Sequence, residues 1–303
     1  MIKRTFRFSS PCYLSLENEQ MVVSYNRIKG QEELPDKKAA IEDVGIILLE
    51  HKQITVTHAL MGRLLENNAA LITCNDTHHP TGLLLNLDGH TNQSERFRAQ
   101  QEASLPLRKQ LWQQTIKAKI ANQAQMLRIA KAEFKYLERL SALVKSGDAD
   151  NHEAQAAAYY WPRLFATAWN FYRRREGEPP NNLLNYGYAI LRAAVARELV
   201  ESGLLPTFGI HHRNRYNSYC LADDIMEPYR PYVDHAVWKI LQETSSINPM
   251  TGEQKRKLVE VLTYDVQIDG ETSPLQIALN RTTSSLAKCF LGKGKKISYP
   301  IGP

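Results

Sequence analysis

Hydrophobic and polar positions alternate in short runs along the first ninety residues. Residues 13–16 and 21–25 are rich in Leu, Val and Tyr and flank a polar turn, which predicts a β-hairpin. Residues 44–49 form an unbroken apolar run, a pattern typical of a strand buried on both faces. Thr57 is placed to cap one short helix. We therefore expect a small β-rich domain at the N-terminus.

A polar segment at residues 88–96 ends this pattern, and helical periodicity follows it. Apolar residues recur at steps of three and four from Leu107 to Val144. Further stretches with helical spacing cover residues 153–175, 181–201, 232–244 and 253–264. The pattern predicts an α+β protein, with a β-rich domain at residues 1–90 and a larger all-α domain at residues 91–303.

Composition narrows the class of protein. The 303 residues are 43% hydrophobic and 23% charged, which is ordinary for a globular protein and excludes wholesale disorder. No apolar run is long enough to cross a membrane, and the N-terminus lacks the apolar segment of a signal peptide. The four cysteines are far apart, which argues against a zinc cluster or a disulfide framework. We expect a cytoplasmic protein without a membrane partner.

Positive charge is concentrated in one part of the chain. The formal net charge is +6, and residues 96–146 hold 11 Lys and Arg against 3 Asp and Glu. A basic segment of this kind indicates a polyanionic partner, usually nucleic acid. The alternative is a solvated helix face that binds nothing.

The first candidate for chemistry is Glu153, which follows Asp150 by three residues. This spacing is that of a capping box, in which two side chains bind the backbone at the start of a helix. The alanines behind Glu153 favour a functional carboxylate instead, because they let another helix approach and partly desolvate it. On spacing alone both interpretations stay open.

The second group of candidates follows Gly209. Neighbouring side chains such as those of His211 and His212 cannot face one point together, so at most one of them belongs to a given site. Asp224 and Glu227 are three residues apart, so on a helical turn they share a face and can bind a hard divalent cation. Their alternative role is favourable negative charge at a helix N-terminus.

Six strings along the chain resemble those of one family. They are IEDVGIILL at 41–49, AKIANQ at 118–123, EAQAA at 153–157, LNYGYAIL at 184–191, GIHH at 209–212 and DIMEP at 224–228. In this order, and over nearly the whole chain, they resemble the CRISPR-associated spacer-acquisition integrases. That family is the larger of the two adaptation proteins, and the strings resemble the form that accompanies type II systems.

The resemblance implies a fold and a metal site. The fold is a small N-terminal β-sandwich that contributes to dimerisation, followed by an α-helical, metal-dependent catalytic domain. The catalytic and metal-binding residues are Glu153, His212 and Glu227, with Asp224 as an additional metal-binding carboxylate. His211 is a rival for the place of His212, because this chain has a second histidine where the family commonly has an aliphatic residue. Carboxylates with one imidazole suit Mg²⁺ or Mn²⁺.

The resemblance also implies an activity and its partners. The activity is insertion of short DNA fragments into a CRISPR array by metal-dependent transesterification, with a DNA 3′-hydroxyl as the nucleophile. The partners are double-stranded DNA (prespacer and CRISPR repeat), a second copy of the chain, a small ferredoxin-fold adaptation protein and type II effector proteins. The residues expected to hold the DNA backbone are Lys117, Lys119, Arg128, Lys131, Arg173, Arg174 and Arg175. The rival functions are a nuclease for branched DNA in repair and a non-catalytic nucleic-acid-binding scaffold.

Overall fold

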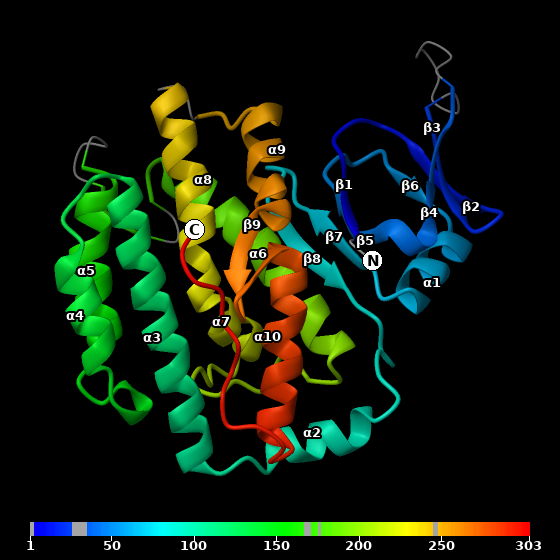
Figure 1. Ribbon diagram of the computed structural model, residues 1–303. Helices are drawn as coiled ribbons and strands as arrows, with labels where there is room; N and C mark the ends of the chain where they lie inside the picture. The colour runs from blue at the N-terminus through cyan, green and yellow to red at the C-terminus, as the bar shows by residue number, and fades with distance from the viewer. Residues whose placement is uncertain (1–2, 26–34, 167–170, 175–176, 245–247) are drawn as a thin grey trace. The chain divides into compact units, whose positions relative to one another are not determined.

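The chain forms two compact units. The computed structural model describes residues 3–25, 35–166, 171–174, 177–244 and 248–303. It divides the chain into Met1–Thr91, called unit 1, and Asn92–Pro303, called unit 2 (Figure 1). The chain as a whole is a mixed α+β structure. Within the described residues, no helix combines the length and the apolar character needed to cross a membrane.

Unit 1 contains two four-stranded sheets and one α-helix. Its elements are β1 (Arg4–Phe8), β2 (Tyr13–Glu17), β3 (Gln20–Ser24), β4 (Lys37–Ala40), the 3₁₀ turn η1 (Ile41–Asp43), β5 (Val44–Leu49), β6 (Thr55–Val56), α1 (His58–Glu66), β7 (Ala70–Cys74) and β8 (Pro80–Leu84). The first sheet has the order β1-β5-β7-β8, and all its pairs are parallel except β7 with β8. The second has the order β4-β3-β2-β6. Its antiparallel pair of β2 and β3 is the hairpin expected from the sequence.

An apolar core joins both sheets of unit 1 to α1. Leu14 from β2, Ile47 from β5 and Leu60 from α1 lie in this core and are fully buried. β5 is buried along five of its six residues, which confirms the expectation for the apolar run. Thr57 caps α1, because its side chain accepts a hydrogen bond from the backbone N–H of Leu60. Helix packing therefore contributes to this core together with the sheets.

Unit 2 is built around a buried helix. Its elements are α2 (Gln93–Gln101), α3 (Leu105–Ile129), α4 (Lys135–Leu143), the 3₁₀ turn η2 (Ser146–Asp148), α5 (His152–Leu164), α6 (Asn181–Glu201), α7 (Cys220–Met226), η3 (Glu227–Tyr229), α8 (Arg230–Glu243), α9 (Gly252–Glu260), η4 (Val261–Thr263), β9 (Asp265–Ile268), β10 (Glu271–Pro274) and α10 (Leu275–Phe290). α6 carries buried residues around its whole circumference, and α7, α8, α9 and α10 pack against it.

The helical pattern expected through residue 144 forms two helices, α3 and α4. Between them, Lys131 adopts a left-handed backbone conformation with φ of 55°. Its N–H donates to the carbonyl of Arg128, and the N–H of Ala132 donates to the carbonyl of Leu127. These two bonds are the Schellman motif that ends many helices. Glycine is the usual residue at this position, so the lysine gave no sign of a helix end.

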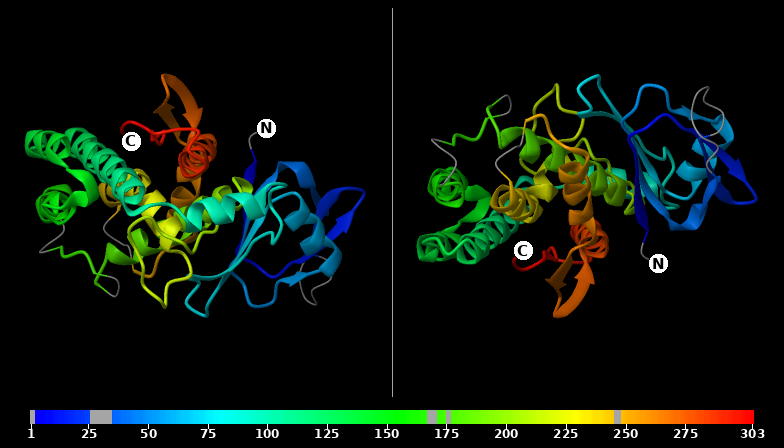
Figure 2. Two further views of the ribbon diagram at one scale, coloured as in Figure 1. Left: turned by 90° about the horizontal axis from the view of Figure 1, so that it is seen from below. Right: turned by 90° about the horizontal axis from the view of Figure 1, so that it is seen from above.

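Two further sequence expectations for unit 2 need correction. α5 ends at Leu164 instead of residue 175, and part of the remaining stretch lies outside the described residues. The unit is also not all-α, because β9 and β10 form an antiparallel hairpin beside α10 (Figure 2). The turn residues Asp269 and Gly270 both have positive φ, as a two-residue hairpin turn requires.

The C-terminal segment that follows α10 lies between α3 and α10 in the views of Figures 1 and 2. The buried Asn122 of α3 binds it. Its Nδ2 donates to the carbonyl oxygens of Pro228, at 2.8 Å, and Pro300, at 3.1 Å. Its Oδ1 accepts from the backbone N–H of Gly302 at 2.8 Å. One side chain thus joins α3, the η3 turn and the C-terminal segment.

Candidate active site

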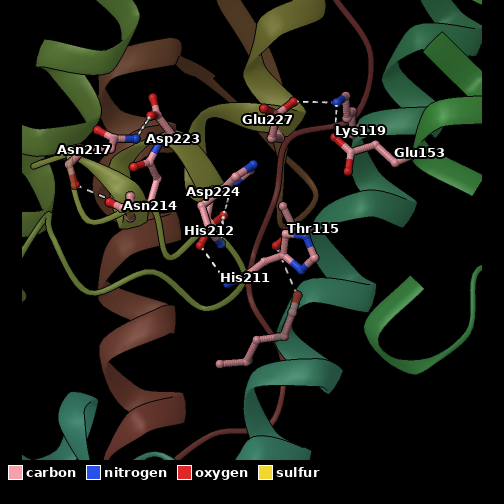
Figure 3. Close-up of polar contacts among 12 residues, drawn as sticks. Thr115, Lys119, Glu153, His211, His212, Asn214, Asn217, Asp223, Asp224 and Glu227 are labelled. Carbon is pink, nitrogen blue, oxygen red and sulfur yellow. Dashed lines mark hydrogen bonds and ion pairs between the residues drawn. The ribbon is translucent and has the colours of Figure 1, made fainter. Parts of the chain in front are cut away.

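The candidate residues come from separate elements of unit 2. Lys119 lies in the middle of α3, and Glu153 lies in the first turn of α5. Asp224 belongs to α7 and Glu227 to η3, while the loop before α7 carries His212. α3 packs against α5, α7 and η3, and this packing brings the side chains together (Figure 3).

A buried lysine joins the two glutamates. Nζ of Lys119 lies 2.6 Å from Oε1 of Glu153 and 2.6 Å from Oε2 of Glu227. Nε of Arg230 lies 2.9 Å from the other oxygen of Glu227. Two carboxylates and two cations therefore balance one another in this cluster. Lys119 is only 9% exposed, so it is not at the surface where the sequence interpretation expected it to contact DNA.

Burial and neighbouring charge act in opposite directions on these groups. Burial by itself raises the pKa of Glu227, but Arg230 and Lys119 outweigh burial and hold that pKa below its ordinary value. Burial lowers the pKa of Lys119, and here the two glutamates outweigh it, so that this pKa lies above its ordinary value. Glu227 and Lys119 are therefore both charged at neutral pH.

Asp224 orients His212. Nδ1 of His212 lies 2.5 Å from Oδ1 of Asp224. The backbone N–H groups of His211 and His212 donate to the same carboxylate, at 2.9 Å and 3.2 Å. The hydrogen bond with Asp224 is the main reason why the pKa of His212 lies above its ordinary value. Asp224 is fully buried whereas the His212 side chain is 44% exposed, so the histidine is accessible to a ligand and its Nε2 is the ring nitrogen left for one.

His211 is held by an aromatic contact instead. Its ring stacks on the indole of the buried Trp112, with centroids 4.1 Å apart and planes 4° from parallel. Burial lowers the pKa of His211 below its ordinary value. The rings of His211 and His212 are perpendicular to each other, at 89°. Stacking on Trp112 therefore fixes the ring of His211, whereas the hydrogen bond to Asp224 fixes the ring of His212.

Gly209 is required by a close approach of the histidine loop. A Cβ at this position would lie 2.4 Å from the carbonyl oxygen of His212 and 2.7 Å from Oδ2 of Asp224. Any side chain there would push the loop away from the carboxylate that holds it. This contact accounts for the glycine three residues before His212.

The start of α5 is capped by Asp148. Its two carboxylate oxygens accept from the backbone N–H groups of His152, at 2.9 Å, and Glu153, at 3.0 Å. Asp150 lies at the surface and pairs with Lys145 at 2.9 Å. Of the two interpretations left open for Glu153, the capping box with Asp150 is therefore wrong, because a different aspartate provides the cap. The carboxylate of Glu153 has no capping role.

Replacing Asp148 by alanine is expected to lower the free energy of unfolding by about 1–2 kcal/mol, because the first turn of α5 loses a charged acceptor. Urea denaturation measures this difference. Asp150→Ala is the matched control, and we expect no measurable change, since Asp150 is exposed. Equal destabilisation by the two substitutions would contradict the cap assignment.

A pocket of about 190 Å³ adjoins Lys119 and Glu227. It is lined by Lys119, Gln123, Ala157, Trp161, Arg173, Tyr188, Glu227, Arg230 and Asp234. The carboxylate of Asp234 accepts hydrogen bonds from the hydroxyls of Tyr188 and of Tyr160, the latter at 2.8 Å. Burial raises the pKa of Asp234 to about 6 in spite of these bonds. The pocket thus places the cationic side chains of Lys119, Arg173 and Arg230 beside the carboxylate of Glu227.

Of the other residues expected to hold DNA, Arg173 lines the same pocket as Lys119 and donates to the backbone carbonyl of Arg174. Arg128 pairs with Glu138 at 2.6 Å, and Arg173 donates to Asn181 at 2.9 Å. Arg175 lies outside the described residues. The remaining members are at least partly exposed: Lys117, Lys131 and Arg174.

The donor atoms of the site suit a hard divalent cation. Glu153 and Glu227 offer carboxylate oxygens and His212 an imidazole nitrogen, a set typical of Mg²⁺ or Mn²⁺ sites. The ammonium of Lys119 already holds positive charge between the two carboxylates. In the arrangement that the structure describes, no three Asp, Glu, His or Cys side chains converge closely enough to enclose a metal ion. Asp224, expected as a further ligand, uses both oxygens on the histidine loop.

Comparison with known proteins places the chain in a family. The family model described as "CRISPR associated protein Cas1" matches residues 6–258. A "CRISPR-associated endonuclease Cas1" from Neisseria meningitidis serogroup C (strain 8013) is 34% identical over 285 residues, which cover 93% of this chain and 90% of that protein. The chain belongs to the Cas1 family. The resemblance noted in the sequence is thereby confirmed.

Solved structures share the fold with this Cas1 family member. A casposase bound to integration product matches with a TM-score of 0.80 and 19% identity, covering 98% of this chain and 92% of that chain. A Cas6-RT-Cas1–Cas2 complex matches with a TM-score of 0.72 and 19% identity, covering 97% of this chain and 35% of that chain. At these identities the likeness establishes the fold.

The sequence interpretation missed that Lys119 belongs to the site of this Cas1 family member. A signal was present in α3, where Lys119 shares a helix face with Trp112, Thr115, Ile116 and Gln123. All four of these residues are buried. A lysine within such a face is rarely left without an anionic partner. The buried neighbours on this face of α3 indicate that Lys119 is buried, which the total charge of the segment does not.

Proposed function

We propose that this Cas1 family member is a metal-dependent DNA integrase of CRISPR adaptation. Its family membership, a relative named as an endonuclease and a structural neighbour captured with an integration product support this class of reaction. In the proposed reaction, the 3′-hydroxyl of a short DNA fragment attacks a phosphodiester at the end of a CRISPR repeat. A new bond to phosphorus forms, and the bond from phosphorus to the 3′ oxygen of the repeat strand breaks. That oxygen leaves as a hydroxyl, and the attacking hydroxyl gives up its proton.

The observation that carries this proposal is the pair of glutamates that meets within a site also containing an oriented histidine. Glu153, Glu227 and His212 would hold Mg²⁺ or Mn²⁺. When bound, such a cation polarises the phosphate and favours the alkoxide form of the attacking hydroxyl. Asp224 acts through His212 as a positioning residue, because it fixes the ring and occupies Nδ1. The stacking of His211 on Trp112 gives that histidine a structural role.

The cations of the adjoining pocket suit the binding of phosphate. Arg173 and Arg230 line the pocket beside Glu227 and offer guanidinium groups, which bind phosphate oxygens well. Exposed basic residues elsewhere on unit 2, such as Lys131 and Arg174, would add backbone contacts that do not read sequence. The DNA partner is therefore proposed as double-stranded prespacer and repeat.

The proposed assembly has further protein components. We infer a homodimer to which unit 1 contributes contacts, together with a small ferredoxin-fold adaptation protein. The similarity to a chain of a Cas1–Cas2 complex supports association with a second adaptation protein. Contact with type II effector proteins is proposed from the sequence resemblance alone.

Strand transfer of a fluorescent DNA fragment into a plasmid carrying CRISPR repeats tests the proposed function. With Mn²⁺ present, we expect transfer, and EDTA should abolish it while the protein still binds DNA. Transfer should return after addition of excess Mn²⁺, which would show that EDTA acts by removing the cation. Transfer that persists in EDTA would exclude the metal-dependent mechanism. DNA binding without transfer would favour a scaffold, and cleavage of branched DNA without transfer would favour a repair nuclease.

A further inference from the structure

We propose that Lys119 is a counter-cation with two positions. In the first, its ammonium neutralises the Glu153–Glu227 pair when no divalent cation is bound. In the second, it has moved away along the adjoining pocket to Gln123, and the carboxylates are open to the divalent cation. This inference rests on the proposed function, because it concerns the same two carboxylates.

The first position is the one that the structure describes. The ammonium lies 2.6 Å from an oxygen of each glutamate, and Lys119 is almost fully buried. Without a positive charge at this point, two carboxylates would face each other in surroundings of low dielectric constant. Arg230 contacts Glu227 from the other side, so it does not replace Lys119 between the two glutamates.

A divalent cation and the ammonium exclude each other from this place. Nζ of Lys119 lies between Oε1 of Glu153 and Oε2 of Glu227, so a divalent cation held by these same two oxygens would compete with it for one place. Repulsion between the two positive charges adds to this steric conflict. Loading the carboxylate pair therefore requires Lys119 to leave.

Gln123 provides the second position. It follows Lys119 by four residues on α3, so both side chains lie on the same helix face. Both also line the pocket of about 190 Å³, which leaves room for the lysine stem to swing. Gln123 is only 3% exposed, and its Oε1 has no hydrogen-bond partner among the residues that the structure describes. A buried acceptor of this kind lacks a donor, and an ammonium group supplies one.

The exchange links the divalent cation to DNA. In the first position, Lys119 and Arg230 balance the two carboxylates, so the site has little net attraction for a divalent cation alone. A DNA phosphate in the pocket gives the displaced ammonium a second anion beside Gln123. Cation and DNA then favour each other's binding, and by linkage the effect is reciprocal. The site is loaded fully only when substrate is present.

Binding of Mn²⁺ to the full-length protein, without DNA, tests the first position. Isothermal titration calorimetry compares the wild type with Lys119→Met, which keeps an unbranched stem and removes the charge. We expect Mn²⁺ to bind at least about tenfold more tightly to Lys119→Met, because one repelling charge is gone. The melting temperature of the metal-free variant should fall, and Mn²⁺ should raise it by more than in the wild type. Lys109→Met, at an exposed position of the same helix, should match the wild type.

Gln123→Leu tests the second position, and it removes no charge. We expect Mn²⁺ to bind this variant several-fold more weakly, since the displaced ammonium loses its acceptor. Lys119→Gln serves as a second uncharged variant if Lys119→Met does not fold, and it should also bind Mn²⁺ more tightly. Unchanged or weaker Mn²⁺ binding by the uncharged Lys119 variants would overturn the proposal. Unchanged Mn²⁺ binding by Gln123→Leu would show that the ammonium of Lys119 does not move to Gln123. These titrations contain no DNA, so they are independent of strand transfer. If the wild type fails to transfer DNA but the variants change Mn²⁺ binding as expected, the proposed function is wrong and the role of Lys119 holds. If the wild type transfers DNA but Mn²⁺ binding does not change, the role of Lys119 is wrong and the proposed function holds.

Discussion

Replacing Glu153 by glutamine is expected to lower the rate of strand transfer by about two or more orders of magnitude, in a protein that still folds. Glutamine has the size of glutamate, but it removes one of the two anionic charges that a divalent cation needs. The cap of α5 is unaffected because Asp148 provides it. The measurement is single-turnover strand transfer with Mn²⁺, with circular dichroism and the melting temperature recorded for the variant.

The matched control for this substitution is Asp150→Asn, three residues earlier on the same segment. Asp150 is exposed and pairs with Lys145 at the surface, so strand transfer should stay at the wild-type level. Near-normal transfer by a folded Glu153→Gln protein would show that the Glu153 charge is dispensable. The metal site proposed for Glu153 and Glu227 would then be wrong.

Replacing His212 by alanine should cause a loss of comparable size, whereas His211→Ala should cost less than about tenfold. His212 is accessible and held at Nδ1 by Asp224, while His211 is stacked on Trp112. Strand transfer, again at single turnover, compares the two variants at equal melting temperature. A His211→Ala protein as impaired as His212→Ala would reverse the assignment of the two histidines.

Asp224→Asn separates positioning from ligation at the same histidine. Asparagine keeps one acceptor for the loop backbone, but it removes the charge that raises the pKa of His212. The wild-type ring should titrate above the ordinary histidine value of about 6.5, and the variant ring lower, as measured by NMR on the metal-free protein. Because the pKa of His212 is raised in the folded protein, the His212–Asp224 pair stabilises the fold most at low pH. Its contribution to the free energy of unfolding is fully present below the unfolded-state pKa and is lost as pH rises through the folded-state pKa.

Much of the fold could be predicted from local patterns. The apolar run that forms β5, the hairpin of β2 and β3, and the cap of α1 by Thr57 all follow from short-range chemistry. The helix over residues 181–201 was predicted with the bounds of α6. The hairpin of β9 and β10 was not predicted, although Asp-Gly between alternating residues is a strong turn signal. Its strands are four residues each, too short to show their own period beside the surrounding helices.

The candidate site was predicted less evenly, because it depends on contacts distant in sequence. Glu153, His212 and Glu227 were named through the family resemblance and do lie in one unit, around α3. Asp148 was missed because its side chain reaches the helix start from a turn with two left-handed residues, Gly147 and Asp148 itself. Spacing rules assume a cap directly before the helix, so they selected Asp150. Lys119 was counted as surface charge because a sum of charges does not distinguish buried from exposed lysines.

The three hydrogen bonds of Asn122 also determine when the site can be completed during synthesis. A ribosome releases α3 and the η3 turn well before residues 300–302, and Asn122 needs Pro300 and Gly302 to fill its bonds. A nascent chain that has not reached these residues therefore lacks the two hydrogen bonds that join Asn122, and through it the η3 turn with Glu227, to the C-terminal segment. The hydrogen bonds that hold Pro228 beside Glu227 are therefore complete only after residues 300–302 have been translated.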